Sequence, residues 1–207
     1  MKTIIILAGL LLFLNLCTGQ AQVVKDPLLD YYNRNFSKVD FAAARDPESP
    51  SPPVTPQTKI YYFEANFTGP GRKSVFITDD GEYLGAHGKY AWLVYCPVKS
   101  GGYQLVSDES DFITGGLGGP GYVGYIDQIK RYGVVTGSKY SVAVDYLDNG
   151  VIKSQSIDEK RGHADAEHYP KYFGDGPHYH ITTYTLAQLA QKYANPDPAN
   201  VITPAAQ

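Results

Sequence analysis

From Lys59 onward the chain alternates short runs of β-branched and aromatic residues with turn residues. Runs of this composition and length are typical of β-strands. The connections between them are too short for crossover helices, so the pattern predicts a mainly β domain built as an antiparallel meander of about eight short strands. The eight runs are KIYYFEANF, KSVFITDD, KYAWLVYCPV, GYQLVS, YVGYID, YGVVTGS, YSVAVDYL and VIKSQSI.

Two of the connections carry clear turn residues. Residues 99–102 (KSGG) join the third and fourth runs, and residues 148–150 (DNG) join the last two. Asn-Gly suits a tight hairpin because both residues accept a positive φ. The spacing of the eight runs is also compatible with two four-strand units, although the sequence shows no convincing repeat.

Short helices are predicted on both sides of the strand runs. Asp26 and Pro27 form a helix start, a capping side chain followed by proline at the first helical position, and LLDYYNRNF continues as an amphipathic segment. Thr185 and Gln188 have the spacing of a capping box that opens the second helix, LAQLAQKY. The predicted architecture is a propeller-blade-like sheet or a small sandwich with a short helix at each end.

The composition divides the chain into four segments. The stretch RDPESPSPPVTPQ is rich in proline and has no apolar period, which is typical of a semi-extended linker. We predict that the helix and linker before the strands lie outside the main core. The segments are residues 1–21, a signal peptide; 22–57, a helix and Pro-rich linker; 58–157, the β domain; and 158–207, a His-rich loop, a helix and a loose tail.

The first residues indicate export. After the short basic start MKT comes the apolar run IIILAGLLLFLNL at residues 4–16, which is shorter than a bilayer-spanning helix and typical of a secretory signal peptide. Gly19 and Ala21 supply the small residues of a cleavage site, which predicts removal of residues 1–21. Acylation of Cys17 is the alternative and would give a lipid-anchored protein. Either outcome predicts a secreted or periplasmic protein with no transmembrane span in its mature chain.

Cleavage would leave Cys96 as the single cysteine, so no intramolecular disulfide is available. The domain must therefore hold together by core burial, for which its 43% hydrophobic residues and 18 tyrosines provide material. Cys96 lies within WLVYC, which predicts a buried free thiol. The net charge is −3 and basic residues are not clustered, so nucleic acid is not an expected partner.

The loop ANFTGPGRKSV, residues 65–75, has the spacing of an oxygen-rich calcium loop that leads into a strand. Its side-chain ligand positions fall on Asn66, Thr68, Pro70 and Ser74. None is a carboxylate, while Arg72 and Lys73 add positive charge at the rim. Because calcium affinity follows the number of charged ligands, we predict a plain turn at Asn66–Ser74 and no calcium site.

The stretches YYFEANFTGPGRKSVFITDD, YAWLVYCPVKSGGYQLV and GYVGYIDQIKRYGVVT together resemble the integrin-type FG-GAP or VCBS unit of exported bacterial proteins. The resemblance covers about residues 58–157. It implies a propeller-blade-like sheet and no established enzymatic activity. The ion loop departs from the family pattern, because its carboxylates are replaced by neutral residues.

Four of the five histidines lie in one segment, together with Asp165, Glu167 and Asp175. Imidazoles and a carboxylate are ligands suited to zinc. The spacing matches no known zinc signature, so a polar surface loop is the simpler interpretation, and a metal site is the alternative. Its candidate ligands are His163, His168, His178 and His180.

Two other patterns are weaker. Asp79-Asp80-Gly-Glu82 and Asp108-Glu109-x-x-Asp111 pair carboxylates, but catalytic pairs are defined by spatial separation, so we predict solvated loop charge at both. The match G-x-G-x-x-G at 116–121 lacks the preceding strand and following helix of a dinucleotide site, and we predict a flexible loop there.

Aromatic residues alternate along the third strand run. Tyr90, Trp92 and Val94 would share one face of the strand, with Leu93 and Tyr95 on the other. Such positions normally build the two surfaces of a sheet, and we predict core packing. Tyrosines that remained exposed would form a platform for a sugar or a protein.

These observations predict a non-enzymatic interaction or structural module of the cell envelope, with no cofactor and with an envelope protein or glycan as its partner. The competing hypothesis is a metal-dependent hydrolase built on the segment from His163 to His180, with zinc as the metal. Convergence of those histidines would distinguish the two.

Overall fold

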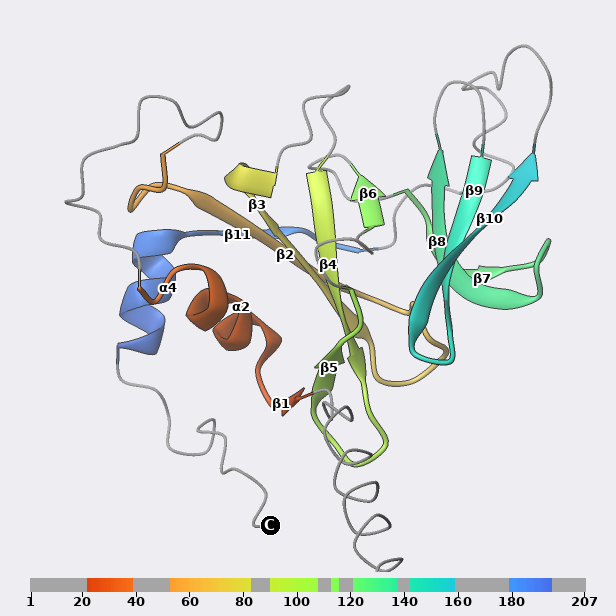
Figure 1. The fold of residues 1–207 in the computed structure, drawn as a ribbon, viewed down its shortest axis with the longest axis horizontal. Coiled ribbons are helices and arrows are strands. Elements are labelled where there is room, and N and C mark those ends of the chain that lie inside the picture. The colour runs from red at the N-terminus through yellow and green to blue at the C-terminus, as the bar shows by residue number, and fades with distance from the viewer. Residues whose placement is uncertain are drawn as a thin grey trace, which may run out of the picture.

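Two antiparallel sheets and two short helices make up the computed structural model, which describes residues 22–38, 53–82, 90–107, 113–115, 121–137, 142–158 and 179–194 (Figure 1). The predicted signal peptide with Cys17, the match at 116–120 and the carboxylates Asp108, Glu109 and Asp111 lie outside the described residues.

The larger sheet carries most of the fold. Its strands lie in the order β1 (Val23–Val24), β5 (Tyr103–Leu105), β4 (Tyr90–Pro97), β3 (Ser74–Asp79), β2 (Lys59–Ala65) and β11 (Thr182–Thr185). A further short strand, β6 (Ile113–Gly115), pairs with the first residues of β4. The 3-10 turn η1 (Asp80–Glu82) follows β3 directly.

The smaller sheet has the order β10 (Val151–Asp158), β9 (Val142–Asp148), β8 (Arg131–Gly137) and β7 (Val123–Ile126). It is a simple meander, since each strand pairs with the strand that follows it in sequence. The register slips between Ser156 and Asp158, where β10 carries a bulge.

The strand prediction is confirmed. All eight predicted runs are strands (β2, β3, β4, β5, β7, β8, β9 and β10), and they form two four-strand meanders, one in each sheet. The strands β1, β6 and β11 were not predicted. They have two to four residues and lie outside the eight runs, whereas β5 and β7, which are as short as β6 and β11, lie within predicted runs.

Both predicted turns are present. Asn149 and Gly150 have φ of 52° and 83°, the positive pair that a tight two-residue hairpin requires. Gly101 and Gly102 each have φ of 88° in the turn between β4 and β5. At Gly102 an added Cβ would also lie 2.8 Å from the carbonyl oxygen of Val24, so a side chain there would push β1 away from β5.

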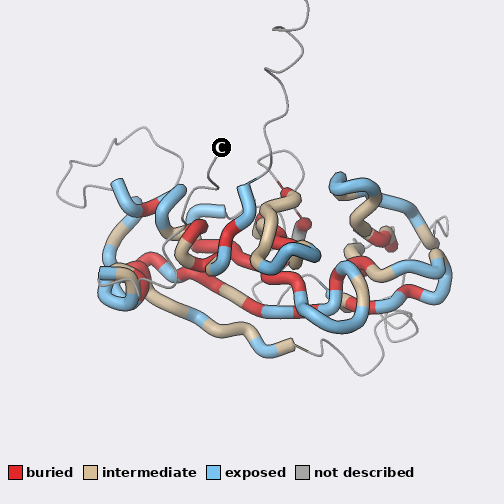
Figure 2. Tube along the Cα trace, turned by 90° about the horizontal axis from the view of Figure 1, so that it is seen from below, coloured by how far each residue is buried: buried red, intermediate tan, exposed pale blue. Residues whose placement is uncertain are grey.

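The larger sheet is buried on both faces. Phe63, Phe76 and Trp92, all fully buried, point toward the smaller sheet and meet Val134 there. Ile60, Ile77 and Tyr95 alternate with them and point to the opposite face. Figure 2 shows the resulting pattern, with buried positions through the middle of the molecule and exposed ones around its periphery.

The two helices cover that opposite face. α2 (Pro27–Asn35) and α4 (Leu186–Tyr193) bury Leu28, Tyr31, Leu186 and Leu189 against it. The prediction that the N-terminal helix lies outside the core was therefore wrong. The sheet offers an apolar surface on each side, and an uncovered second face would leave it in contact with water.

α4 begins as predicted. The hydroxyl of Thr185 accepts a hydrogen bond from the backbone N–H of Gln188, and the Gln188 side chain accepts one from the N–H of Thr185. This reciprocal capping box satisfies two donors that a helix start otherwise leaves unpaired. Because Thr185 is also the last residue of β11, the strand passes directly into the helix.

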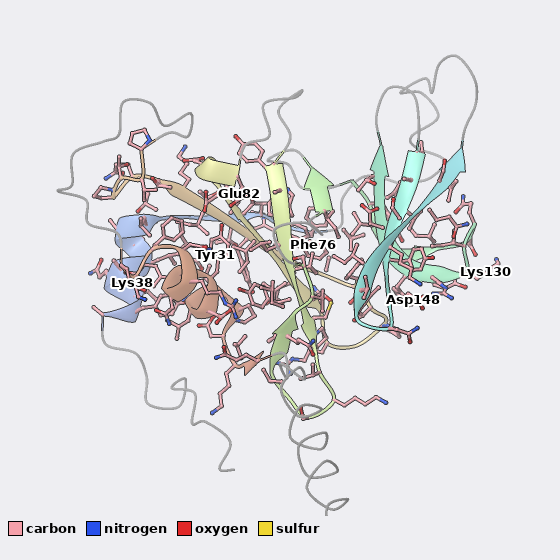
Figure 3. All side chains as sticks on the ribbon, viewed as in Figure 1. Tyr31, Lys38, Phe76, Glu82, Lys130 and Asp148 are labelled. Carbon is pink, nitrogen blue, oxygen red and sulfur yellow. The ribbon has the colours of Figure 1, made fainter. Side chains whose placement is uncertain are left out.

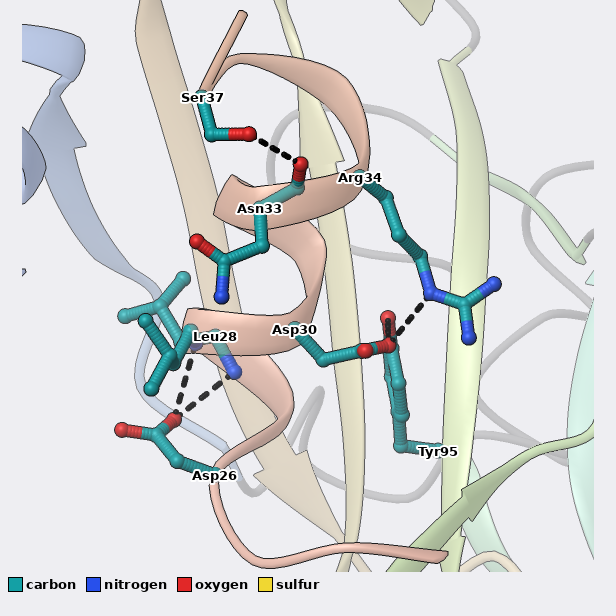
Figure 4. Close-up of polar contacts among 8 residues, drawn as sticks. Asp26, Leu28, Asp30, Asn33, Arg34, Ser37 and Tyr95 are labelled. Atoms are coloured by element: carbon teal, nitrogen blue, oxygen red, sulfur yellow. Dashed lines mark hydrogen bonds and ion pairs between the residues drawn. The ribbon is translucent and has the colours of Figure 1, made fainter. Parts of the chain in front are cut away.

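α2 is joined to the sheet by polar contacts as well as by packing. At its start, Asp26 accepts hydrogen bonds from the N–H groups of Leu28 and Leu29, as the Asp-Pro pair predicted. One turn later, the Asp30 carboxylate accepts from Arg34 Nε at 2.7 Å and from Tyr95 Oη of β4 at 3.0 Å (Figure 4).

The carboxylate of Asp79 is buried at the end of β3. Tyr31 Oη of α2 donates a hydrogen bond to it at 2.7 Å, and the N–H of Gly81 donates a second. Burial raises the pKa of Asp79, opposed in part by these hydrogen bonds. The prediction of solvated loop charge was wrong here. Asp79 lies on the sheet face that α2 covers, and sequence spacing alone does not show that cover.

The raised pKa of Asp79 has a consequence for stability. A carboxyl group with a higher pKa in the folded state binds its proton more tightly there, so its contribution to stability is fully present below its unfolded pKa, near 3.8. That contribution is lost as the pH rises through the folded-state pKa. The Asp79→Asn variant should therefore gain stability relative to the native protein as the pH rises from about 4 toward neutrality.

Urea unfolding of both proteins at several pH values measures this difference. Other titrating groups are shared and cancel in it. A difference that stayed constant, or that moved in favour of the native protein with rising pH, would contradict the burial effect assigned to Asp79.

Candidate functional site: a tyrosine-lined groove

The predicted metal segment lies mostly outside the described residues, which exclude His163, His168 and His178. His180 is described and exposed, just before β11. Within the described ranges, no three His, Cys, Asp or Glu side chains are grouped closely enough to hold a metal ion. The polar surface loop therefore stays the prediction for this segment, with the metal site as its alternative.

The loop from Asn66 to Ser74 turns the chain between β2 and β3. Gly69 and Gly71 both have positive φ, as the turn requires. Ser74 is fully buried, and its hydroxyl donates to Cys96 Sγ at 3.6 Å, so it points into the core and away from the loop. One of the four calcium-ligand positions is therefore directed elsewhere. The prediction that the loop binds no calcium stays open to a calcium titration.

Cys96 is a buried free thiol, as predicted. Burial raises its pKa to about 12, opposed slightly by the Ser74 hydroxyl. The reactive thiolate is therefore scarce near neutral pH. This arrangement suits a packing residue and gives no support to a nucleophile.

Among the described residues, a groove of about 350 Å³ has the volume of a small-molecule site. It opens where the start of α2, the last turn of α4 and the helix-side face of the larger sheet meet. The groove combines three tyrosines with four ionisable side chains, and Leu28 and Val75 form its apolar floor. Its polar and aromatic lining consists of Tyr62, Tyr103, Tyr184, Lys25, Lys192, Asp26 and Glu64.

Alternation along their strands places the three tyrosines on the same face of the larger sheet. Tyr62 on β2, Tyr103 on β5 and Tyr184 on β11 all pack at the margin of the cluster under the helices. Each is partly exposed, because neither helix extends over this part of the sheet. Tyr62 Oη donates to the Glu64 carboxylate. Burial, followed by that hydrogen bond, raises the pKa of Tyr62 well above its usual value, so its hydroxyl stays protonated.

Cationic side chains lie over the aromatic rings of the groove. The Lys192 ammonium lies 5.4 Å from the ring centre of Tyr184 and 5.1 Å from that of Tyr193, both within cation–π range. The Arg72 guanidinium lies 4.1 Å from the ring centre of Tyr103. These contacts hold the aromatic rings in place before any ligand arrives.

Asp26 has two functions in this groove. While one carboxylate oxygen caps α2, the other accepts a hydrogen bond from Tyr193 Oη of α4 at 3.1 Å. This contact joins the start of α2 to the end of α4. The pKa of Tyr193 is raised by burial and by the Asp26 charge, so this hydrogen bond persists through the neutral range.

The sequence indicated aromatic surfaces but not which tyrosines would be accessible. Trp92, Val94 and Tyr95 are fully buried, with Tyr90 and Leu93 partly so, which confirms core packing on β4. The groove draws its tyrosines from three separate strands, one of which was not predicted. Only the tertiary fold brings these three tyrosines together.

A smaller cavity of about 160 Å³ lies beside η1. Within it, Asp80 accepts hydrogen bonds from Tyr61 Oη at 2.8 Å and from the N–H of Lys59 at 2.9 Å. These bonds satisfy the carboxylate structurally and tie the start of β2 to the end of β3. These hydrogen bonds therefore have a structural role, and the cavity is a weaker candidate for ligand binding than the tyrosine-lined groove.

Comparison with known proteins gives no further assignment: no family model, curated protein or solved structure matches the chain. The resemblance to the FG-GAP unit therefore stays a prediction. In the part of the chain that the structure describes, neither helix has the length and apolar character needed to cross a membrane.

Proposed function

We propose that this protein is an exported, non-enzymatic interaction module that binds a polar ligand of the cell envelope in the tyrosine-lined groove. The observation that carries the proposal is the groove itself. It combines partly exposed tyrosines with charged side chains of both signs, and this mostly polar lining suits a polar ligand.

The contacts within the groove support binding over catalysis. Both carboxylates of the lining accept hydrogen bonds from tyrosines, Glu64 from Tyr62 and Asp26 from Tyr193. Groups paired in this way are held in fixed positions, which lowers the entropy lost when a ligand binds. A general base or nucleophile would instead need a group whose pKa or position leaves it able to react.

Co-sedimentation with insoluble envelope material from the producing organism tests the proposal. The native protein should bind saturably. A variant with Tyr103→Ala and Tyr184→Ala should bind at least about tenfold more weakly, because aromatic anchors dominate binding energy. Tyr125→Ala is the matched control, since Tyr125 is 43% exposed on β7 in the other sheet. Equal binding by all three proteins would contradict the proposal.

The alternative of a zinc-dependent hydrolase rests on the histidine segment from His163 to His180. Metal analysis of the purified protein tests it directly. One zinc ion per chain, lost in the variant with His178→Ala and His180→Ala, would favour that alternative over the interaction module.

A further inference from the structure

We propose that the ligand of the tyrosine-lined groove is an uncharged saccharide, a hexose unit within an envelope glycan. This inference rests on the proposed function and specifies the class of ligand. It follows from the charge of the lining, from the arrangement of hydrogen-bonding groups and from the position of the groove on the sheet.

The charged side chains at the groove are of both signs. Lys25 and Lys192 of the lining and Arg72 over the Tyr103 ring are cationic, and Asp26 and Glu64 are anionic. A ligand with several like charges would approach groups of its own sign at short range, which is unfavourable in partly desolvated surroundings. The groove therefore gives neither an anionic nor a cationic ligand a surface of a single opposite sign.

A quaternary or primary ammonium ligand is opposed for a second reason. Aromatic cages bind such cations over open ring faces. Here the protein's own cations already lie over two of the rings, Lys192 over Tyr184 and Arg72 over Tyr103. A ligand cation would have to displace Lys192 or Arg72. The cation–π contact that it formed would then only replace the one that the displaced side chain had lost.

A saccharide fits the remaining chemistry. Each sugar hydroxyl both donates and accepts, and the lining offers ammonium donors, carboxylate acceptors and tyrosine hydroxyls at neighbouring positions. The carbon-bound hydrogens of a pyranose ring form an apolar face, which can pack on the ring of Tyr62.

A peptide partner is less well matched. Extended peptides bind by adding a strand to an open sheet edge. The floor of the groove is instead a sheet face, where β2 is hydrogen-bonded to β3 and β11 on its two sides. Peptide affinity would have to come from side chains alone, within a volume of about 350 Å³.

Two pairs of oligosaccharides test the inference. N-acetylated chito-oligosaccharide is neutral, and its deacetylated counterpart is cationic. A galactan oligomer is neutral, and oligogalacturonate is its anionic counterpart. Calorimetric titration should detect binding of at least one neutral member, with its charged counterpart at least about tenfold weaker. A library of short acidic and basic peptides serves as the comparison class.

Two readouts locate the binding. In the native protein, backbone amide NMR shifts should cluster around Tyr62, Tyr103 and Tyr184, a result that needs no variant to fold. The variant with Tyr103→Ala and Tyr184→Ala should lose binding, and Tyr125→Ala should retain it.

The outcomes separate the two proposals. Binding of a charged sugar or a peptide through the groove, at least as tight as that of any neutral sugar, would overturn the saccharide inference and leave the interaction function standing. The saccharide inference would also be overturned, and the interaction function would stand, if none of the four oligosaccharides bound while envelope binding still depended on the groove. Envelope binding that is unaffected by the groove variant would overturn both.

Discussion

Replacing Phe63 by alanine is expected to lower the free energy of unfolding by about 3–5 kcal/mol. Phe63 is fully buried, and its ring stacks on Phe76 at 4.6 Å and on Tyr179 at 4.1 Å, with Trp92 edge-on at 5.1 Å. Removing it leaves a cavity in the layer between the two sheets and removes the central ring of this aromatic cluster. Figure 3 shows where that layer lies, with Phe76 on β3 in the middle of the molecule.

Urea or thermal unfolding measures the effect. Val151→Ala on β10 is the control, because Val151 is 50% exposed and its truncation should change stability by no more than about 0.5 kcal/mol. A loss below about 1 kcal/mol for Phe63→Ala would mean that the two sheets do not share this core.

The second large effect is expected at Tyr31. Tyr31→Ala should cost about 3–5 kcal/mol, since it removes a ring that is 1% exposed. The same change deprives the buried Asp79 carboxylate of one of its hydrogen-bond donors, the Tyr31 hydroxyl, and leaves the N–H of Gly81. Tyr31→Phe keeps the ring and isolates the hydroxyl, so a smaller loss of about 1–3 kcal/mol is expected from it.

Asn33→Ala is the matched control on the same helix, because Asn33 is exposed and its hydrogen bond from Ser37 is made by its backbone carbonyl. Comparable losses for Tyr31→Ala and Asn33→Ala would indicate that α2 does not dock on the sheet. A Tyr31→Phe variant as stable as the native protein would show that the Asp79 contact contributes nothing net.

Much of the fold was predictable because its signals are local. The eight predicted strands lie in β-branched and aromatic runs, the Asn149-Gly150 hairpin needs two positive φ values, and the capping box at Thr185 is formed by neighbouring residues. Each of these depends on a few consecutive side chains. They can therefore be predicted without knowledge of the tertiary structure.

The candidate site was not predictable to the same degree. Tyr62 and Tyr184 come from strands that are adjacent in the sheet but far apart in sequence, and β11 itself has four residues. Whether a tyrosine is buried or lines a groove depends on where α2 and α4 end. The sequence showed the helices but not the face that they cover, which is also why Asp79 was mistaken for a solvated charge.

The pairing of β11 with β2 has a further consequence for the order of events in folding. Thr182 lies opposite Tyr62, so the larger sheet is completed by one of the last described strands of the chain. Contacts of such large sequence separation form slowly, because the intervening chain must first be ordered. The groove contains residues from Lys25 to Lys192 and does not exist in any shorter intermediate. Binding in the proposed groove would therefore report that the chain is folded from Lys25 to Lys192.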